Sequence, residues 1–243
     1  MNEENYQRVN AFIEKNKIDA DIELLFIALC HSSYANEVSQ INEIEIQSNE
    51  RLEFLGDAVL DCSLADILYN YFNLSEGEMS KIRAMVGSEV VLSKVSEELY
   101  VGEFLFLGKG EIASGGAKRP SILADAFEAI LAAIYLSKGF KISKKFVFDH
   151  LFKYISLAVE GELFLDYKTS LQELTQAEYG SRPVYELVGS YGPPQERIFK
   201  VKVMINEKEM GIGTGRTKKS AEQMAAHKAI DYLKKKGVEI IND

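Results

Sequence analysis

Apolar residues recur at three- and four-residue spacing from the N-terminus to about residue 158. This period is typical of helices that bury one face. Glycine and serine separate the periodic stretches, most clearly in 108–116, which we expect to be a flexible loop. Since no convincing strand alternation occurs here, residues 1–160 are expected to form an all-α domain. The predicted helices are Ile22–Cys30, Leu52–Phe72, Met79–Leu99, Ile122–Leu136 and Phe146–Leu157.

The pattern changes after Gly161. A helical period covers 166–179 and ends at Gly180, and a final helix is predicted from Thr217 to Lys236. Between them, strands are predicted at Val184–Tyr191, Ile198–Ile205 and Met210–Gly213, with turns at 192–194 and 206–207. In the middle strand, apolar side chains alternate with Lys200 and Lys202, so one face is buried. Residues 166–236 are therefore expected to form a small α+β module of the order α-β-β-β-α, which makes the chain multidomain.

Charge is distributed unevenly between these two parts. The chain has a net charge of −9, but residues 1–165 hold 26 acids and 15 bases, whereas residues 166–236 hold 9 acids and 13 bases. An acidic part joined to a basic part suggests that one holds metal and the other a polyanion. The polar N-terminus and the lack of a long apolar run predict a cytoplasmic protein without a membrane span. Cys30 and Cys62 are expected to be buried free thiols.

An acidic stripe is predicted on the helix that follows Asn49, a plausible N-cap. Glu50, Glu53, Asp57 and Asp61 fall at i, i+3, i+7 and i+11, on one narrow face. No basic residue follows Arg51 before Phe72, so these like charges repel one another. For Glu50 and Asp61 a solvated or capping role is the preferred interpretation.

A second pair of acids lies in residues 121–136, which are otherwise apolar on every side. Asp125 and Glu128 share one face there, and buried charges without partners cost several kcal/mol each. If they converge with Glu53 and Asp57, the result is a site of carboxylate oxygens. Such a site suits a hard cation such as Mg²⁺, which can activate water and stabilise charge on a phosphate.

The start of the last helix is basic. Gly213 and Gly215 are expected to let the chain turn tightly into it, beside Arg216, Lys218 and Lys219. A helix N-terminus with lysines is a natural phosphate clamp. An ordinary solvated helix start capped by Thr217 is the alternative. Lys109, in the glycine-rich loop, is a further candidate for a phosphate contact.

These segments resemble a known family. NERLEFLGDAV (49–59) and SILADAFEAILAAIYL (121–136) are similar to the two acidic motifs of bacterial ribonuclease III, and 75–89 and 107–111 also match family segments. The segments 192–203 and 213–226 resemble a double-stranded RNA-binding domain. The resemblance covers almost the whole chain in the family's order and involves both domains.

The resemblance implies an endonuclease that cuts both strands of double-stranded RNA, leaving 5′-phosphate and 3′-hydroxyl ends. By resemblance, Glu53, Asp57, Asp125 and Glu128 hold Mg²⁺, with Mn²⁺ able to substitute, and Asp57 and Glu128 are catalytic. Glu50 and Glu76 are supporting acids, and Phe54 packs across the interface of a homodimer. Processing of rRNA precursors and other structured transcripts is expected. The implied RNA-binding residues are Gln172, Gln195, Arg216, Lys218 and Lys219, with Gln195 standing where the family often has His.

Two other functions remain open at this point. A non-catalytic RNA-binding scaffold could keep the fold, but such a protein should have lost some of the four acids, and all four positions are filled. A nucleotide phosphohydrolase with an acidic helical core is the second alternative. The basic C-terminal module favours a large polyanion over a small substrate.

Overall fold

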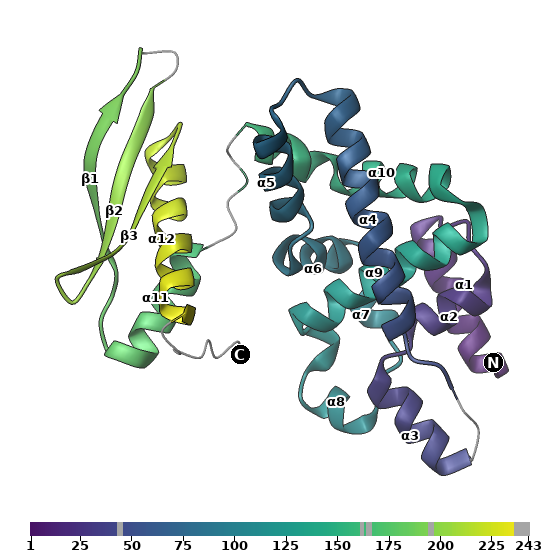
Figure 1. The fold of residues 1–243 in the computed structure, drawn as a ribbon. Coiled ribbons are helices and arrows are strands. Elements are labelled where there is room, and N and C mark those ends of the chain that lie inside the picture. The colour runs from purple at the N-terminus through teal and green to yellow at the C-terminus, as the bar shows by residue number, and fades with distance from the viewer. Residues whose placement is uncertain (43–45, 161–162, 164–166, 194–196, 236–243) are drawn as a thin grey trace. The chain divides into compact units, whose positions relative to one another are not determined.

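The computed structural model describes residues 1–42, 46–160, 163, 167–193 and 197–235 (Figure 1). The chain forms two compact units, Met1–Ser156 and Leu157–Asp243. The predicted fold class is confirmed, because a helical unit is followed by an α-β-β-β-α unit. The predicted domain limits, 1–160 and 166–236, stay a prediction.

In the part of the chain that the structure describes, the N-terminal unit is built from helices. Its long central helices are α4 (Glu50–Tyr71) and α9 (Pro120–Lys138), which cross each other (Figure 1). The remaining elements are α1 (Glu3–Asn16), α2 (Ile22–Leu29), α3 (Ser32–Asn42), α5 (Glu76–Val86), α6 (Glu89–Glu98), α7 (Val101–Phe104), α8 (Lys109–Ala113), the 3₁₀ turn η1 (Gly116–Lys118) and α10 (Phe140–Val159).

Helix α9 is the core element of this unit. Most of its side chains are buried, and Phe127, Ile130 and Leu131 are fully buried. By length and composition it is the one described helix that could cross a membrane, but 61% of its 18-residue apolar window is buried inside the unit. That burial fits the core of a folded domain, and it means that Asp125 and Glu128 project from an element surrounded by protein.

The single helix predicted over Met79–Leu99 is wrong. Two helices, α5 and α6, occupy this range, and the helical conformation is interrupted at Gly87–Ser88. Gly87 ends α5, and its backbone N–H bonds to the carbonyl of Arg83 at 2.8 Å. The apolar period continues across the break because both helices bury residues, such as Val86 and Val91, in the same unit.

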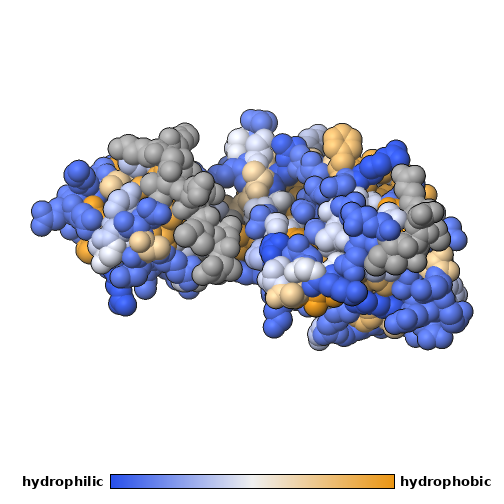
Figure 2. Space-filling view, turned by 90° about the horizontal axis from the view of Figure 1, so that it is seen from below, coloured by the Kyte–Doolittle hydropathy of each residue, from blue (hydrophilic) through white to orange (hydrophobic). Residues whose placement is uncertain are grey.

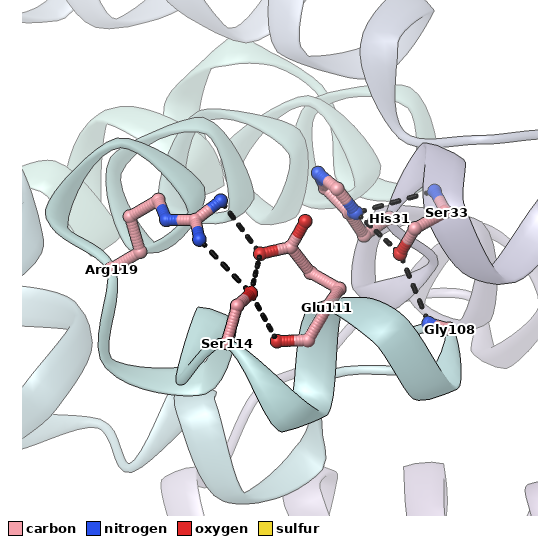
Figure 3. Close-up of polar contacts among 6 residues, drawn as sticks. All are labelled: His31, Ser33, Gly108, Glu111, Ser114 and Arg119. Atoms are coloured by element: carbon pink, nitrogen blue, oxygen red, sulfur yellow. Dashed lines mark hydrogen bonds and ion pairs between the residues drawn. The ribbon is translucent and has the colours of Figure 1, made fainter.

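The predicted flexible loop over 108–116 is also wrong, because it contains α8 and the start of η1. Figure 3 shows how its ends are held. At one end, the backbone N–H of Gly108 donates to Ser33 Oγ at 3.0 Å. At the other end, Arg119 pairs with Glu111 at 2.6 Å and donates to Ser114 Oγ at 3.2 Å. These contacts fix the residue that immediately precedes α9, and with it the start of the helix that carries Asp125 and Glu128.

Two local predictions around α4 need correction. Cys30 is buried as expected, but Cys62 is exposed, because it lies on the outer face of α4. Asn49 precedes α4 without a side-chain capping bond. Instead it is 2% exposed, and its backbone N–H donates to the carbonyl of Cys30 at 2.8 Å. Asn49 therefore ties the start of α4 to the end of α2 through its main chain.

The C-terminal unit packs two helices on one face of an antiparallel sheet of strand order β1-β2-β3 (Figure 1). Its elements are α11 (Tyr167–Tyr179), β1 (Val184–Tyr191), β2 (Ile198–Ile205), β3 (Lys208–Gly215) and α12 (Lys218–Lys235). The predicted alternation of β2 is confirmed, since Val201, Val203 and Ile205 are buried. Asn206 and Glu207 both have positive φ, as a two-residue hairpin turn requires.

Glycines of β3 have a different role from the one predicted. A Cβ atom on Gly213 would lie 2.2 Å from the carbonyl oxygen of Ala221, and one on Gly215 would lie 1.9 Å from Ser220 Oγ. Neither glycine has a positive φ. They are strand residues that let α12 approach the sheet closely, so the prediction of a tight turn here is wrong.

The face of the molecule in Figure 2 is mostly hydrophilic, with scattered hydrophobic residues, which is usual for a folded chain. The sequence predictions that fall on Gly161, Asp166, Pro194, Gln195 and Lys236 lie outside the described residues.

Candidate active site and nucleic-acid interface

The acids of α4 and α9 meet where these helices touch. A Cβ atom on Gly56 would lie 1.9 Å from the main-chain oxygen of Glu128, so only glycine allows this approach. Glu53 and Asp57 lie within one turn of Gly56 on α4. The contact therefore brings the predicted acids of both helices to one place.

The pKa values of these carboxyl groups show how strongly they interact. The pKa of Glu128 is raised to about 8, chiefly by burial and then by four nearby acids: Asp57, Asp125, Glu53 and Asp61. Burial, followed by Glu53, raises the pKa of Asp125 to about 6. Burial also raises the pKa of Glu53, with smaller contributions from Glu50 and Asp57. Acidic groups whose ionisation is disfavoured by burial and by neighbouring carboxylates are thus concentrated at this helix crossing.

Sequence reasoning missed two residues of this site. Glu89 also raises the pKa of Asp125, because the break between α5 and α6 turns the first residue of α6 toward α9. Gly56 was not singled out either. A glycine inside a helix costs about 1 kcal/mol relative to alanine, so its presence in the middle of α4 is the signal that marks a close approach.

The other predicted acids surround this group. Glu50 is exposed and accepts a hydrogen bond from Ser48 at 2.7 Å. Asp61 lies 3.7 Å from the guanidinium of Arg83, a cation that α5 supplies and that the sequence of α4 alone does not reveal. Glu76 is the first residue of α5, and its carboxylate accepts from Ser80 Oγ at 2.9 Å. These three acids are solvated or partnered.

The ligand chemistry of the four acids, though not their spacing in this structure, fits a divalent cation. Within the described residues, no three His, Cys, Asp or Glu side chains lie in positions to share one metal ion. The carboxylates lie close enough together to raise the pKa of Glu53, Asp125 and Glu128 without forming a closed set of ligands. A hard cation would offset that repulsion, and carboxylate oxygens are the ligands it prefers.

An exposed apolar stripe runs along α4 beside the acids. Phe54 is 83% exposed and Tyr69 is 76% exposed, and the exposed Ala58, Cys62 and Ala65 lie between them. The Cys62–Tyr69 end of the stripe borders a cleft of about 430 Å³ between α4 and α5, which Met79 and Arg83 also line. Large aromatic side chains this exposed on a helix are typical of an interaction surface.

The basic surface of the C-terminal unit begins at α12. Arg216, Lys218 and Lys219 are all exposed. The predicted cap is confirmed, because Thr217 Oγ1 accepts from the backbone N–H of Ser220 at 3.0 Å, and Ser220 Oγ accepts from that of Thr217 at 3.0 Å. On α11, Gln172 is exposed.

Lys109, in the other unit, is 88% exposed and lies 3.6 Å from Glu37, so its phosphate contact stays a prediction.

Both units match known protein families. A ribonuclease-III-like family model matches residues 21–155, and a double-stranded RNA binding motif matches residues 167–233. Ribonuclease 3 of Pseudothermotoga lettingae is 46% identical over 213 residues, which is 87% of this chain and 90% of that protein. Ribonuclease 3 of Borreliella burgdorferi is 41% identical over 232 residues, 95% of this chain and 93% of that protein.

The chain belongs to the ribonuclease III family.

Among solved structures, the nuclease domain of ribonuclease III from Campylobacter jejuni, described for flexibility in a region involved in dimer formation, matches with a TM-score of 0.53 and 34% identity. It covers 60% of this chain and 96% of that domain. The protein is thus an endoribonuclease for double-stranded RNA, and its family uses a divalent metal. Because the chain belongs to this family, the two alternative functions, a non-catalytic RNA-binding scaffold and a nucleotide phosphohydrolase, have no support.

Proposed function

We propose that the protein cleaves both strands of duplex RNA by Mg²⁺-assisted hydrolysis at the crossing of α4 and α9. Glu53, Asp57, Asp125 and Glu128 would hold the ion, and Mn²⁺ would substitute for it. The observation that carries this proposal is the half-buried Glu128, whose pKa is raised to about 8 by burial first and then by four nearby acids. A carboxyl group tuned in this way is typical of a functional site.

The proposed roles of the site residues follow from how exposed each side chain is. Glu128 and Asp125 project from the buried helix α9, so they would anchor the cation and lose their protons as it binds. Asp57 is exposed and would act at the side open to substrate, where Asp57 and Glu128 are the proposed catalytic pair. Bound Mg²⁺ would supply a Lewis acid for the phosphodiester and lower the pKa of water. Glu50 and Glu76 would support the site from its edge.

Long duplex RNA incubated with Mg²⁺, with Mn²⁺ and with EDTA tests the metal requirement, and Glu128→Gln tests the site. We expect either metal to support cleavage, EDTA to stop it, and Glu128→Gln to lower the rate by roughly a thousandfold or more, because these acids act as a unit. The matched control is Glu97→Gln, an exposed glutamate on α6 that should keep the full rate. Undiminished cleavage by Glu128→Gln would overturn the assignment.

We further propose that two copies pair through the apolar stripe of α4. A two-fold axis that crosses α4 between Phe54 and Tyr69 would bring Phe54 of one copy to the cleft at Cys62–Tyr69 of the other. The exposed Phe54 and the apolar cleft on the same helix support this arrangement, since a two-fold interface must be self-complementary. Each copy would contribute one centre and cut one strand.

Sedimentation of the Phe54→Ala variant tests the pairing. We expect a shift from dimer to monomer at micromolar concentration, because Phe54 would be a central buried aromatic of the interface. Tyr100→Ala, an exposed aromatic away from the stripe, is the control and should stay dimeric. An unchanged dimer in Phe54→Ala would exclude this interface.

Duplex RNA would be held by Arg216, Lys218 and Lys219 through phosphates and by Gln172 and Gln195 through the minor groove. The exposure of the described members of this set supports the assignment. We also propose a cytoplasmic role in processing rRNA precursors and other structured transcripts, supported by family membership.

A further inference from the structure

The C-terminal unit contains a polar hollow of about 310 Å³ between α11, β1 and the start of α12. Gln172 of α11 and Lys219 of α12, two of the proposed RNA-binding residues, both line it. Lys168, Tyr185 and Gln223 line the same hollow. Helix α11, proposed to read the minor groove, and the start of α12, proposed to bind phosphate, therefore line the same hollow. The contacts that hold these two helices together set the distance between Gln172 and Lys219.

Gln223 joins the two helices directly. It is only 6% exposed, and its Oε1 accepts a hydrogen bond of 2.9 Å from the backbone N–H of Lys168. Lys168 lies in the first turn of α11, where backbone N–H groups have no acceptor within their own helix. The side chain of Gln223 thus caps α11 from another helix.

A charged contact strengthens the same junction. Lys168 Nζ lies 2.6 Å from the carboxylate of Glu222, the neighbour of Gln223, and 4.6 Å from the ring centre of Tyr185. The Glu222 side chain is 18% exposed. One residue of α11 is therefore bound through its main chain and its side chain to adjacent residues of α12.

We propose that Gln223 is a positioning residue for duplex RNA, holding the first turn of α11 against α12 so that Gln172 and Lys219 reach one duplex at a fixed spacing. This inference rests on the proposed RNA-binding surface. Phosphates occur in RNA and DNA alike, whereas the 2′-hydroxyl that α11 would meet in the minor groove occurs only in RNA. Loosening α11 should therefore weaken binding of RNA duplexes far more than binding of DNA duplexes.

Fluorescence anisotropy with the full chain in EDTA, using an RNA and a DNA duplex of the same sequence, tests this. Gln223→Met keeps the length of the side chain but removes the acceptor. We expect it to weaken RNA binding about tenfold, the usual effect of a lost hydrogen bond at a buried group, and DNA binding less than twofold. Gln223→Glu keeps an acceptor and should retain the ratio of RNA to DNA affinity.

The outcomes separate the two proposals. If Gln223→Met weakens both duplexes equally, or leaves the ratio unchanged, the residue is merely structural and the inference is wrong. Gln223→Asn is the milder second variant, too short to reach Lys168, and should lower the ratio in the same direction. Lys219→Ala should reduce the salt dependence of binding to both duplexes. An unchanged salt dependence would overturn the proposed binding surface itself, whatever Gln223 does.

Discussion

The α-carbon of Gly56 faces the main-chain carbonyl of Glu128, with no room for a side chain between them. At this contact α4 and α9 approach each other directly beside the acids they carry. Its effect is electrostatic as well as steric, because it holds Asp57 and Glu53 near enough to raise the pKa of Glu128. The position of the charged residues therefore depends on a residue with no side chain.

We expect Gly56→Ala to separate the two helices and disperse the acids. The added Cβ would lie 1.9 Å from Glu128 O, and backbone must move to relieve that clash. Overpacking of this kind costs about 1–3 kcal/mol of unfolding free energy. Displacing the acids by even about 1 Å should lower the cleavage rate about a hundredfold. Denaturant unfolding and cleavage of duplex RNA measure the two effects.

Gly110→Ala is the control for that variant. Gly110 also lies in a helix, α8, but a Cβ atom there would have nothing within 4 Å. Its stability should be equal or slightly higher, since alanine restricts the unfolded chain. If Gly56→Ala behaved like Gly110→Ala, the helix crossing would not be what positions the acids.

Glu128→Gln should stabilise the metal-free protein at pH 9 while lowering the cleavage rate roughly a thousandfold or more. At that pH the carboxylate is ionised, and Asp57 and Asp125 repel it, so replacing it with a neutral isostere removes the repulsion. We expect a rise in Tm of a few degrees. Added Mg²⁺ should raise the Tm of the parent chain much more than that of the variant. A lower Tm for metal-free Glu128→Gln would contradict the electrostatic interpretation.

The pKa values also predict how pH acts on the parent chain. The pKa of Glu128 is about 8 against an ordinary 4.5, and that of Asp125 is about 6 against 3.8. The folded state therefore holds these protons more tightly than the unfolded state does. The free energy of unfolding of the metal-free chain should fall as pH rises from about 4 to 8.

Metal binding has the opposite pH dependence, because it requires the ionised carboxylates. Below pH 8, the affinity for Mg²⁺ should fall by up to about tenfold per pH unit for each proton released. Mg²⁺ titrations at pH 6, 7 and 8, followed by thermal unfolding, measure this, and Glu128→Gln should flatten the upper part of the profile. Equal affinity at all three values would show that Glu128 does not bind the ion.

In the C-terminal unit, Gly213→Ala should be strongly destabilising. Its Cβ would lie 2.2 Å from both Ala221 O and Ala225 N, so α12 would have to leave the sheet. We expect a loss of about 1–3 kcal/mol or more and weaker binding of duplex RNA. Thr214→Ala, an exposed neighbour on the same strand, is the control. Anisotropy with duplex RNA and thermal unfolding report the two effects.

The sequence predicted most of the elements and the acids that meet, because these depend on local patterns. The alternation in Ile198–Ile205 fixes a strand with one buried face, and the structure has it at those bounds. Asp125 and Glu128 stood out because no basic residue accompanies them in an apolar helix, and burial in α9 is what raises their pKa. Patterns of this kind need no knowledge of distant contacts.

What could not be predicted depends on contacts between segments far apart in the chain. The break at Gly87–Ser88 leaves the apolar period intact, so Glu89 was not expected beside Asp125. The glycine spacing in β3 predicts a turn, whereas the packing of these glycines against α12 depends on a contact that the local sequence does not contain. Arg83 reaches Asp61 from another helix, and Asn49 uses its main chain where a side-chain cap was expected.

Helix α4 carries two of the four proposed metal ligands, Glu53 and Asp57, and the exposed apolar stripe on neighbouring faces. If two copies pair through that stripe, the separation of their two centres is set by one continuous helix of 22 residues in each. A rigid helix does not adjust to its substrate, so the stagger between the cuts on the two strands would be a property of the protein. Every RNA duplex that it cuts would then acquire ends of the same geometry, whatever its base sequence.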